Sequence, residues 1–416
     1  MILYSDLALD GRVRREASAL SAAGCEVRLA CLDGDSVADD MPAGVRALEC
    51  RPWGPSPLTG VESRATLAAA PRTRRAMGTF RWVIDYLRSL RSWGRAAVDL
   101  CGDVDAWHVH DLTGLVAIAP ELAADRPVIY DSHELFTETG FVGRLPWVAR
   151  ALIRKYERRL IRRTSALVTV NESVARVMVR RYDPERVVIV YNALPKWDPS
   201  RREASRLHNA VGLHPSNRVV LYHGAFGPGR GISQVAEAML EPGLRETHLV
   251  FVGFGPYMAQ VADLVRDPRF GGRVHVLPSV LPDQLPGLIS SADVGVVAMQ
   301  PTTMNLRLST PNKLFECIGA GVPVVVSDFA EMRAIVREGP WGPLGETCNP
   351  ESPASIAAAL RRILELDHAS YAVLRERCRT AAQQRWNWES ESAKLIALYA
   401  DVVVAAAGAQ LVTTDG

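Results

Sequence analysis

The stretch VVLYHGAFGPGRGISQVAEAM (219–239) decides the fold, because it combines a buried strand, a glycine-rich loop and a helix in that order. Glycines let a ligand approach the backbone closely, and the free N–H groups at the start of a following helix favour an anion. Gly227 and Gly229 are therefore candidate phosphate contacts, and Arg230 is a candidate charged contact. The alternative is a tight turn whose glycines serve packing, with Arg230 in solvent.

Two other nucleotide-binding patterns come close to this part of the chain. The glycine loop has nearly the spacing of a P-loop, but Arg230 replaces the lysine and Gly231 replaces the Ser or Thr that holds Mg²⁺. Gly253 and Gly255 follow a strand, as in dinucleotide-binding dehydrogenases, but Met258 stands where the third glycine belongs. The loop therefore argues against an NTPase and gives a dehydrogenase only weak support.

Outward from this stretch, short β-branched runs alternate with longer amphipathic segments along most of the 416 residues. Such alternation predicts an α/β fold of parallel sheets covered by helices. Two series predict two doubly wound, Rossmann-like domains, with the ligand cleft at the carboxyl ends of their strands. The polar stretch 192–216 places the boundary between residues 195 and 196, and the irregular stretch 51–75 predicts a mobile insertion.

A second motif, NLRLSTPNKLFECIGAGVPVVVSD (305–328), predicts a helix whose first turn contains Pro311. The N–H groups of Asn312–Leu314 would then be unpaired and available to a diphosphate. Lys313, one of only four lysines in the chain, lies in that turn, and Glu316 lies one turn further on. A carboxylate there can accept two hydrogen bonds from a vicinal diol such as a ribose. The alternative has Glu316 as a helix cap and Lys313 in solvent.

Composition narrows the class of protein. The net charge of +2 implies no general attraction to nucleic acid. The seven cysteines form no C-x-x-C pair, which predicts buried free thiols in a reducing compartment. No secretion signal and no apolar run long enough to span a bilayer are visible in the sequence. We therefore expect a cytoplasmic protein, or one attached at most to the inner membrane surface.

Two basic stretches suggest what the protein binds besides a phosphate. Residues 146–163 carry seven basic side chains against one acid, Glu157, with apolar positions at helical spacing. Residues 80–95 interleave Trp82, Tyr86 and Trp93 with arginines. Basic amphipathic helices with aromatic residues can lie on anionic membrane, which would suit a lipid-linked acceptor. The alternative is that each helix packs its apolar face on its own sheet.

The two donor-side motifs resemble, in this order, the nucleotide half of retaining GT-B glycosyltransferases of sequence family four. The resemblance extends over nearly the whole chain, from DLALDGRVRREASALSAAGCEVRL, through DAWHVHDLTGLVAIAP and VIYDSHELF, to PSVLPDQLPGLISSADVGVVAM. RWNWESESAKLIALY resembles the terminal helix that returns to the first domain, so residues 388–405 are expected to complete domain 1–195 beside domain 196–387. The fold implied is GT-B, two Rossmann-like domains facing a central cleft.

The resemblance also implies roles for individual residues. Glu316 would bind the donor ribose, the segment Thr310–Leu314 (with Pro311 and Asn312) and the loop Gly227–Arg230 would hold the diphosphate, and the backbone at Val280 would face the base. His133 would reach the transferred sugar. By their positions, His110 and Asp111 end a neighbouring strand and could line the cleft on the acceptor side. Asp10 and Arg12 lie in the first βα loop, where they could touch donor or acceptor; the alternative is an N-cap and a solvated arginine. Two positions depart from the family pattern: Leu308 replaces a second glutamate, and Ala225 replaces an arginine.

The activity implied is transfer of a hexose-type sugar from a nucleotide-diphosphate donor to an acceptor hydroxyl, with retention. His133, Arg230 and Lys313 are the catalytic candidates, and the leaving diphosphate itself could take the acceptor proton. No D-x-D element suggests a metal site, so we expect no metal and no cofactor. UDP is the slightly favoured nucleotide of the donor. The acceptor is expected to be a small molecule or lipid-linked. The alternatives are a non-catalytic sugar-nucleotide-binding module and a GT-B nucleotide-sugar epimerase.

Overall fold

The computed structural model covers the 416-residue chain. It describes residues 1–4, 10–32, 44–50, 72–123, 126–139, 142–198, 202–203 and 205–414, without the side chains of 49–50, 72–84 and 404–414. The chain forms two compact units. The first contains residues 1–170, 175–190 and 392–416, and the second contains 171–174 and 191–391. The sequence-based boundary at 195/196 compares with an observed one at 190/191, and most of the predicted insertion 51–75 lies outside the described residues.

The first unit is built on a seven-stranded sheet whose neighbouring strands are all parallel. Its strands, in sheet order, are β3 (Val45–Cys50), β2 (Val27–Leu32), β1 (Ile2–Leu3), β4 (Trp107–His110), β5 (Val128–Ser132), β6 (Ala166–Thr169) and β7 (Val187–Ile189). Strands β4, β5 and β6 are buried along their whole length, although β4 and β5 carry the polar side chains His108, His110 and Asp131. The order of strands reverses between β1 and β4, where doubly wound folds bind ligands.

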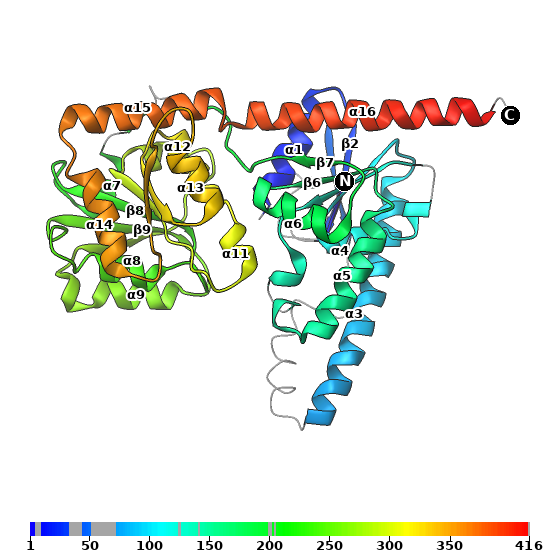
Figure 1. The fold of residues 1–416 in the computed structure, drawn as a ribbon, viewed down its shortest axis with the longest axis horizontal. Helices are drawn as coiled ribbons and strands as arrows, with labels where there is room; N and C mark the ends of the chain where they lie inside the picture. The colour runs from blue at the N-terminus through cyan, green and yellow to red at the C-terminus, as the bar shows by residue number, and fades with distance from the viewer. Residues whose placement is uncertain are drawn as a thin grey trace. The chain divides into compact units, whose positions relative to one another are not determined.

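Helices cover this sheet on both faces (Figure 1). The helices of the first unit are α1 (Gly11–Ala22), α3 (Arg72–Cys101), α4 (Asp111–Ala117), α5 (Trp147–Ile161), α6 (Glu172–Tyr182) and most of α16 (Trp388–Thr414). Helix α16 packs on the sheet through Tyr399, whose hydroxyl lies 2.8 Å from Nδ1 of His108 on β4. Helix α3 contributes Trp93 to the core, edge to face with Tyr4, so this aromatic side chain is not on the surface.

The second unit has a six-stranded parallel sheet. Its strands, in sheet order, are β10 (Val274–Leu277), β9 (Thr247–Phe254), β8 (Arg218–Ala225), β11 (Val294–Val297), β12 (Val324–Ser327) and β13 (Gly345–Cys348). The order reverses between β8 and β11, so the glycine loop after β8 lies at this unit's switch point.

Helices α8 (Ile232–Ala238), α9 (Met258–Arg266) and α14 (Pro353–Leu364) cover one face of this sheet and share one apolar core with it. The other helices of the unit are α7 (Arg206–Val211), α10 (Leu285–Ser290), α11 (Met304–Leu308), α12 (Asn312–Gly319), α13 (Ala330–Arg337) and α15 (His368–Gln384). Helix α12 packs against α10 and α15, which fixes the segment that carries Lys313 and Glu316.

Two expectations from composition can be compared with the structure. Five of the described cysteines are buried free thiols, but Cys25 is exposed, so the expectation of buried thiols is wrong for that residue. Among the described residues, no helix is long and apolar enough to cross a membrane.

Candidate functional site

The first unit brings its predicted site residues together at the carboxyl edge of its sheet. Asp10 follows β1, His110 ends β4, Asp111 begins α4, and His133 follows β5. His133 Nε2 lies 3.2 Å from His110 Nδ1, and His133 Nδ1 lies 3.6 Å from Asp111 Oδ2 and 3.8 Å from Asp10 Oδ2. Three of the predicted residues, Asp10, His110 and Asp111, thus surround the imidazole of the fourth, His133, which is 17% exposed.

Beneath this edge lies a buried polar cluster that sequence reasoning missed, apart from Arg12 and His110. Arg12 donates to both oxygens of Asp131, from Nε at 2.9 Å and from Nη2 at 3.1 Å, and Nη1 donates to the Val190 carbonyl at 2.7 Å. Glu16 Oε1 lies 2.9 Å from Arg12 Nε, and His108 Nε2 lies 3.6 Å from Glu16 Oε2. The signal that could have revealed Asp131 is its polar side chain in the otherwise apolar strand VIYDS.

Arg12 differs from its expected environment. The interpretation with a solvated arginine is wrong, because the Arg12 side chain is 3% exposed and its guanidinium is engaged by protein groups. The matching interpretation of Asp10 as an N-cap is confirmed, since its Oδ1 accepts from the N–H groups of Arg12 and Val13. Whether either residue contacts a donor or an acceptor stays a prediction.

Four side chains of this cluster, Glu16, His108, His110 and Asp131, have potential metal-ligand atoms within 4.8 Å of one another. Arg12 Nε lies 2.9 Å from both Asp131 Oδ2 and Glu16 Oε1, so a protein cation already pairs with the Asp131 carboxylate. We therefore interpret the cluster as an ion-pair network built around an arginine.

The electrostatics of the cluster follow from its burial. Although burial alone would lower it, the carboxylates of Asp111 and Asp131 raise the pKa of His133 to about 10. Burial, and then the neighbouring Asp131 carboxylate, raise the pKa of Glu16 well above its ordinary value. Burial lowers the pKa of His110 below its ordinary value. The directions of these shifts favour the neutral forms of Glu16 and His110 and the charged form of His133.

The glycine loop of the second unit joins β8 to α8 at the switch point. Gly229 and Gly231 have φ values of +71° and +69°, in the left-handed region that favours glycine. A Cβ at Gly231 would also lie 2.1 Å from the Ala298 carbonyl oxygen, so packing requires glycine there. A Cβ at Gly227 would meet only Pro256 Cγ, at 3.8 Å, so no protein atom explains that glycine. Open space at Gly227 fits the predicted close approach of a ligand.

Lys313 is 6% exposed, and its Nζ lies 3.9 Å above the centre of the Tyr222 ring. Burial, followed by repulsion from Arg230, lowers the pKa of Lys313 to about 7. Arg230 is half-buried, and its Nη1 faces Met299 Sδ at 3.6 Å. The burial of Lys313 shows that the interpretation of a solvated lysine is wrong, and within the described residues neither cation has a carboxylate within ion-pair distance.

Glu316 faces the carboxyl end of β8. Its Oε2 lies 2.7 Å from His223 Nε2, and no described group bonds Oε1. His223 is buried and was missed from the sequence, although its position directly before Gly224 at a strand end was a usable signal. The pairing with His223 fixes the Glu316 carboxylate and leaves one oxygen for a ligand. The helix-cap interpretation is wrong, because Pro311 is the N-cap of α12 and no described side chain caps that end of the helix.

The start of α12 differs in part from expectation. The helix begins at Asn312, and Pro311 is its N-cap rather than a residue of its first turn. The Leu314 N–H donates to the Pro311 carbonyl at 2.9 Å, so the prediction of a free amide at Leu314 is wrong. Thr310 Oγ1 accepts from Asn171 Nδ2 at 3.2 Å, and Asn312 Oδ1 accepts from Asn192 Nδ2 at 2.7 Å.

Two other positions named from the sequence lie in the same unit. Val280 is half-buried in the loop after β10. The Leu308 carbonyl accepts from Asn171 Nδ2 at 2.7 Å.

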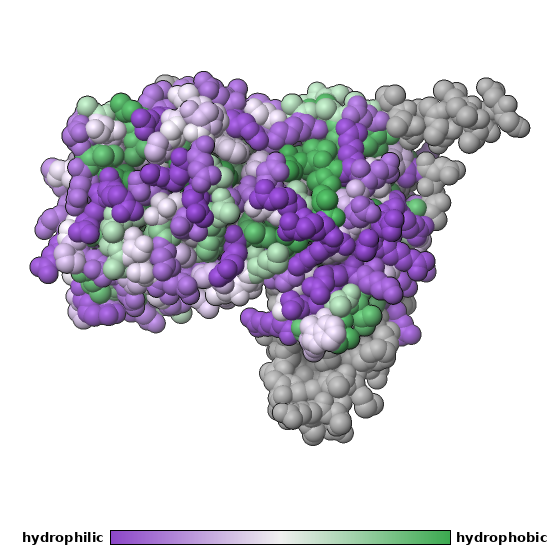
Figure 2. Space-filling model, in the orientation of Figure 1, coloured by the Kyte–Doolittle hydropathy of each residue, from purple (hydrophilic) through white to green (hydrophobic). Residues whose placement is uncertain are grey.

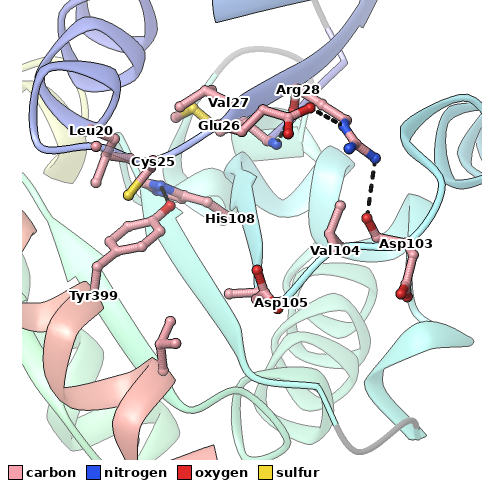
Figure 3. A pocket seen from close by; sticks show the side chains of 14 residues that line it. Leu20, Cys25, Glu26, Val27, Arg28, Asp103, Val104, Asp105, His108 and Tyr399 are labelled. Carbon is pink, nitrogen blue, oxygen red and sulfur yellow. Dashed lines mark hydrogen bonds and ion pairs between the residues drawn. The ribbon is translucent and has the colours of Figure 1, made fainter. Parts of the chain in front are cut away.

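A cavity of about 350 Å³ lies elsewhere in the first unit, at the amino ends of β1, β2 and β4 (Figure 3). His108 and Tyr399 form one wall, and Arg28 on the far side bonds Glu26 and the Asp103 carbonyl, as Figure 3 shows. None of the predicted site residues lines this cavity.

Helix α5 carries an apolar surface that sequence reasoning had assigned either to a membrane or to its own sheet. Trp147, Val148 and Leu152 are 73%, 49% and 64% exposed, so these apolar positions do not pack on the sheet. The exposed basic residues of the same helix are Lys155, Arg158 and Arg159. Figure 2 shows apolar side chains grouped next to hydrophilic ones over the part of the molecule where Figure 1 places α5.

Two Rossmann-like units, one with a glycine loop beside unpaired cations at its switch point, define the class: a GT-B fold. Residues 12–195 match the family described as Glycosyltransferase Family 4, and residues 217–366 match that described as Glycosyl transferases group 1. The chain belongs to this family of glycosyltransferases, so the resemblance drawn from the sequence is confirmed.

The relatives agree with this assignment. An uncharacterized glycosyltransferase of Methanocaldococcus jannaschii, MJ1607, is 24% identical over 71% of this chain and 75% of its own. Sucrose-phosphate synthase of Thermosynechococcus elongatus superimposes with a TM-score of 0.71 at 17% identity, over 97% of this chain and 99% of that one. Anabaena Alr3699/HepE in complex with UDP-glucose gives a TM-score of 0.64 at 15% identity, over 96% and 99% of the two chains. These structural neighbours confirm the GT-B fold.

Proposed function

We propose that the protein transfers a hexose-type sugar from a nucleotide-diphosphate donor to an acceptor hydroxyl, with retention and without a metal ion. The observation that carries the proposal is the pair of cations Lys313 and Arg230, which face the glycine loop without a described carboxylate partner. A buried charge without a counterion is costly, so such a pair is expected where a ligand brings the negative charge. The diphosphate of a sugar nucleotide is that ligand.

In the proposed reaction the bond between the sugar anomeric carbon and the β-phosphate oxygen breaks, and its electron pair stays on the phosphate. Lys313 and Arg230 stabilise that charge, and the free N–H groups of Asn312 and Lys313 add hydrogen bonds. The acceptor oxygen forms the new bond on the same face, and its proton goes to the leaving phosphate oxygen. The Glu316 oxygen not bonded to His223 holds the ribose diol.

UDP is the nucleotide that we favour for the donor, supported by structural neighbours that contain UDP or UDP-glucose. The test is nucleotide release from a panel of UDP-, GDP-, ADP- and dTDP-sugars, with EDTA present. We expect one donor class to release nucleotide, and Glu316→Ala to lose most of that activity while the control Glu338→Ala, changed at an exposed residue, keeps it.

Other outcomes of this panel would favour the alternatives. Acceptor-free conversion of the nucleotide sugar without release would indicate an epimerase. Binding without any turnover would indicate a sugar-nucleotide-binding module. Release that requires a divalent metal and stops with EDTA would contradict metal independence.

We further propose that α5 contacts anionic membrane and brings the protein to a lipid-linked acceptor. Trp147 and Leu152 supply exposed apolar area, and the basic residues next to them supply attraction to anionic headgroups. Sedimentation with vesicles that contain phosphatidylglycerol should exceed that with phosphatidylcholine alone. Leu152→Ser should reduce it several-fold, since burial of a leucine side chain contributes about 2 kcal/mol.

The matched control for this test is Val373→Ser on α15, a comparably exposed apolar residue on another helix, at 52%. Equal sedimentation with both vesicle types, or equal loss in both variants, would leave a soluble small-molecule acceptor as the favoured alternative.

A further inference from the structure

His133 lies between carboxylates that face both of its ring nitrogens. Nδ1 is 3.6 Å from Asp111 Oδ2 and 3.8 Å from Asp10 Oδ2, and Nε2 is 3.3 Å from Asp131 Oδ2. A neutral imidazole carries one N–H, so its second nitrogen would direct a lone pair at a carboxylate. Only the imidazolium places an N–H on both sides.

The three carboxylates are each held in place by their other oxygen. Asp10 Oδ1 accepts from the first N–H groups of α1, as its N-cap. Asp111 Oδ1 accepts from the main-chain N–H of His133 at 3.1 Å. Asp131 Oδ1 accepts from Arg12 Nη2 at 3.1 Å. None of them can turn away from the ring without losing a hydrogen bond.

The backbone conformation of Asp111 is a second indication that the surroundings hold its carboxylate beside the His133 ring. Asp111 has a φ of +56°, and it is one of two described non-glycine residues with a positive φ. A left-handed conformation at such a residue costs roughly 1 kcal/mol and persists where the surroundings require it. Here it coincides with the residue that both accepts from the His133 main chain and faces its ring.

We propose that His133 is a permanently charged hydrogen-bond donor rather than a proton acceptor, and that Asp131 is the positioning residue that holds it so. Its Nε2–H faces Asp131 Oδ2 and His110 Nδ1 inside the protein. Its Nδ1–H faces the partly exposed carboxylates of Asp10 and Asp111 at the edge of the sheet.

The titratable groups around the ring come from the start of α1, from β4 and α4, and from β5. They are Asp10, Arg12, Glu16, His108, His110, Asp111 and Asp131. Burial raises the pKa of Glu16 and lowers those of His108 and His110, which favours the neutral form of all three. The charged set is then three carboxylates against Arg12 and His133. A neutral His133 would leave that set with a larger uncompensated negative charge.

The consequence for catalysis rests on the proposed function. A charged His133 cannot take the proton of an acceptor hydroxyl, so that proton must go to the leaving phosphate. A sugar hydroxyl at this edge would accept from the His133 Nδ1–H and donate to Asp10 or Asp111. The charge of the ring itself can be measured without any donor, so the two proposals can fail separately.

The test is a nitrogen NMR titration of the full chain labelled only at histidine, with the His133 signals assigned through His133→Gln. We expect both ring nitrogens to keep imidazolium shifts from about pH 6 to about pH 9, well above the ordinary histidine pKa of about 6.5. A midpoint near that ordinary value, or one deprotonated nitrogen at neutral pH, would overturn the proposal. It would leave the donor site untouched.

Two variants identify what holds the charge. Asp131→Asn should lower the His133 midpoint by about two units, and Asp111→Asn by about one, because each removes a facing carboxylate. Asp131→Asn also leaves Arg12 partly unpaired, so Asp111→Asn, whose carboxylate is 33% exposed, is the variant expected to fold in any case. The control is Asp103→Asn, 88% exposed, which should leave the midpoint unchanged. Equal midpoints in all three variants would contradict the role given to the carboxylates.

Discussion

The carboxyl edges of the two sheets hold their cations in opposite ways. At the first, Arg12 and His133 are surrounded by carboxylates from the same unit. At the second, Lys313 and Arg230 lie beside a glycine loop, and no described carboxylate is paired with either. The first set pairs two cations with carboxylates of the same unit, whereas we propose that the second set binds an anion from outside. On this proposal, Arg12 and Asp131 support the fold, and Lys313 and Arg230 bind the ligand.

The largest expected effect tests the complete set. Arg12→Met removes the partner of the buried Asp131 carboxylate, and breaking a buried ion pair costs about 3–5 kcal/mol of unfolding free energy. Urea unfolding measures the loss, and Arg126→Met, which breaks a partly exposed pair with Asp103, should change stability by less than about 0.5 kcal/mol. The double variant Arg12→Met/Asp131→Asn should regain part of the loss. A loss in Arg12→Met no larger than in the control would contradict the comparison.

Lys313→Met should lower activity rather than stability, the reverse of Arg12→Met. Loss of the cation should lower donor turnover by about 10²- to 10³-fold, because it stabilises the leaving diphosphate. Stability of the free protein should not fall, because methionine replaces a buried charge that lacks a partner. Turnover and urea unfolding of the same variant measure both effects, with Lys196→Met, changed at an exposed lysine, as the control. A variant that unfolds readily yet keeps its turnover would refute the assignment of Lys313.

The pH dependence of stability sharpens the same contrast. Burial lowers the folded-state pKa of Lys313 from 10.5 to about 7, so between these values the unfolded chain binds more protons than the folded one. Stability contributed by this residue therefore rises with pH across that window, by up to about 1.4 kcal/mol per unit. As pH increases, the free energy of unfolding of wild type should therefore rise relative to that of Lys313→Met. A pH-independent difference would show that the lysine is not buried as a charge.

The smallest expected effect concerns Glu316, which is only half satisfied within the protein. Glu316→Gln keeps the shape of the side chain but weakens the pairing with His223 and acceptance from a ribose diol. We expect nucleotide affinity to fall about tenfold, equivalent to about 1.4 kcal/mol. Isothermal titration measures it against Glu338→Gln. A variant with unchanged affinity would move the ribose contact elsewhere.

Sequence patterns predicted every described strand except β3 and β13. The run VVVS of β12 is buried along its whole length, as expected for a strand covered on both faces. Strands β3 and β13 lie at sheet edges, but so do β7 and β10, which were predicted although they are only partly buried. The two missed strands, VRALEC and GETC, each contain only one β-branched residue, so they lack the composition that marked most of the others.

The residues of the candidate site were also only partly predicted from the sequence. Residues that follow a strand or open a helix, such as His133 and Lys313, were found from local motifs. Asp131 and His223 were missed, because their roles depend on partners 119 and 93 residues away in the chain. The Leu314 amide was wrongly taken as free, because a tight bond to Pro311 at the start of α12 leaves no mark in the sequence. Pairing over long separations is what the sequence alone does not reveal.

The central claim is that Lys313 and Arg230 of the second unit bind the diphosphate of the donor. The most direct measurement is calorimetric titration with UDP-glucose, or the donor that the panel selects, at about pH 8 in two buffers of different ionisation enthalpy. An arriving diphosphate should raise the lowered pKa of Lys313, so wild type should take up most of one proton per donor bound and Lys313→Met none. Tight binding without proton uptake, or equal uptake in the variant, would contradict the account.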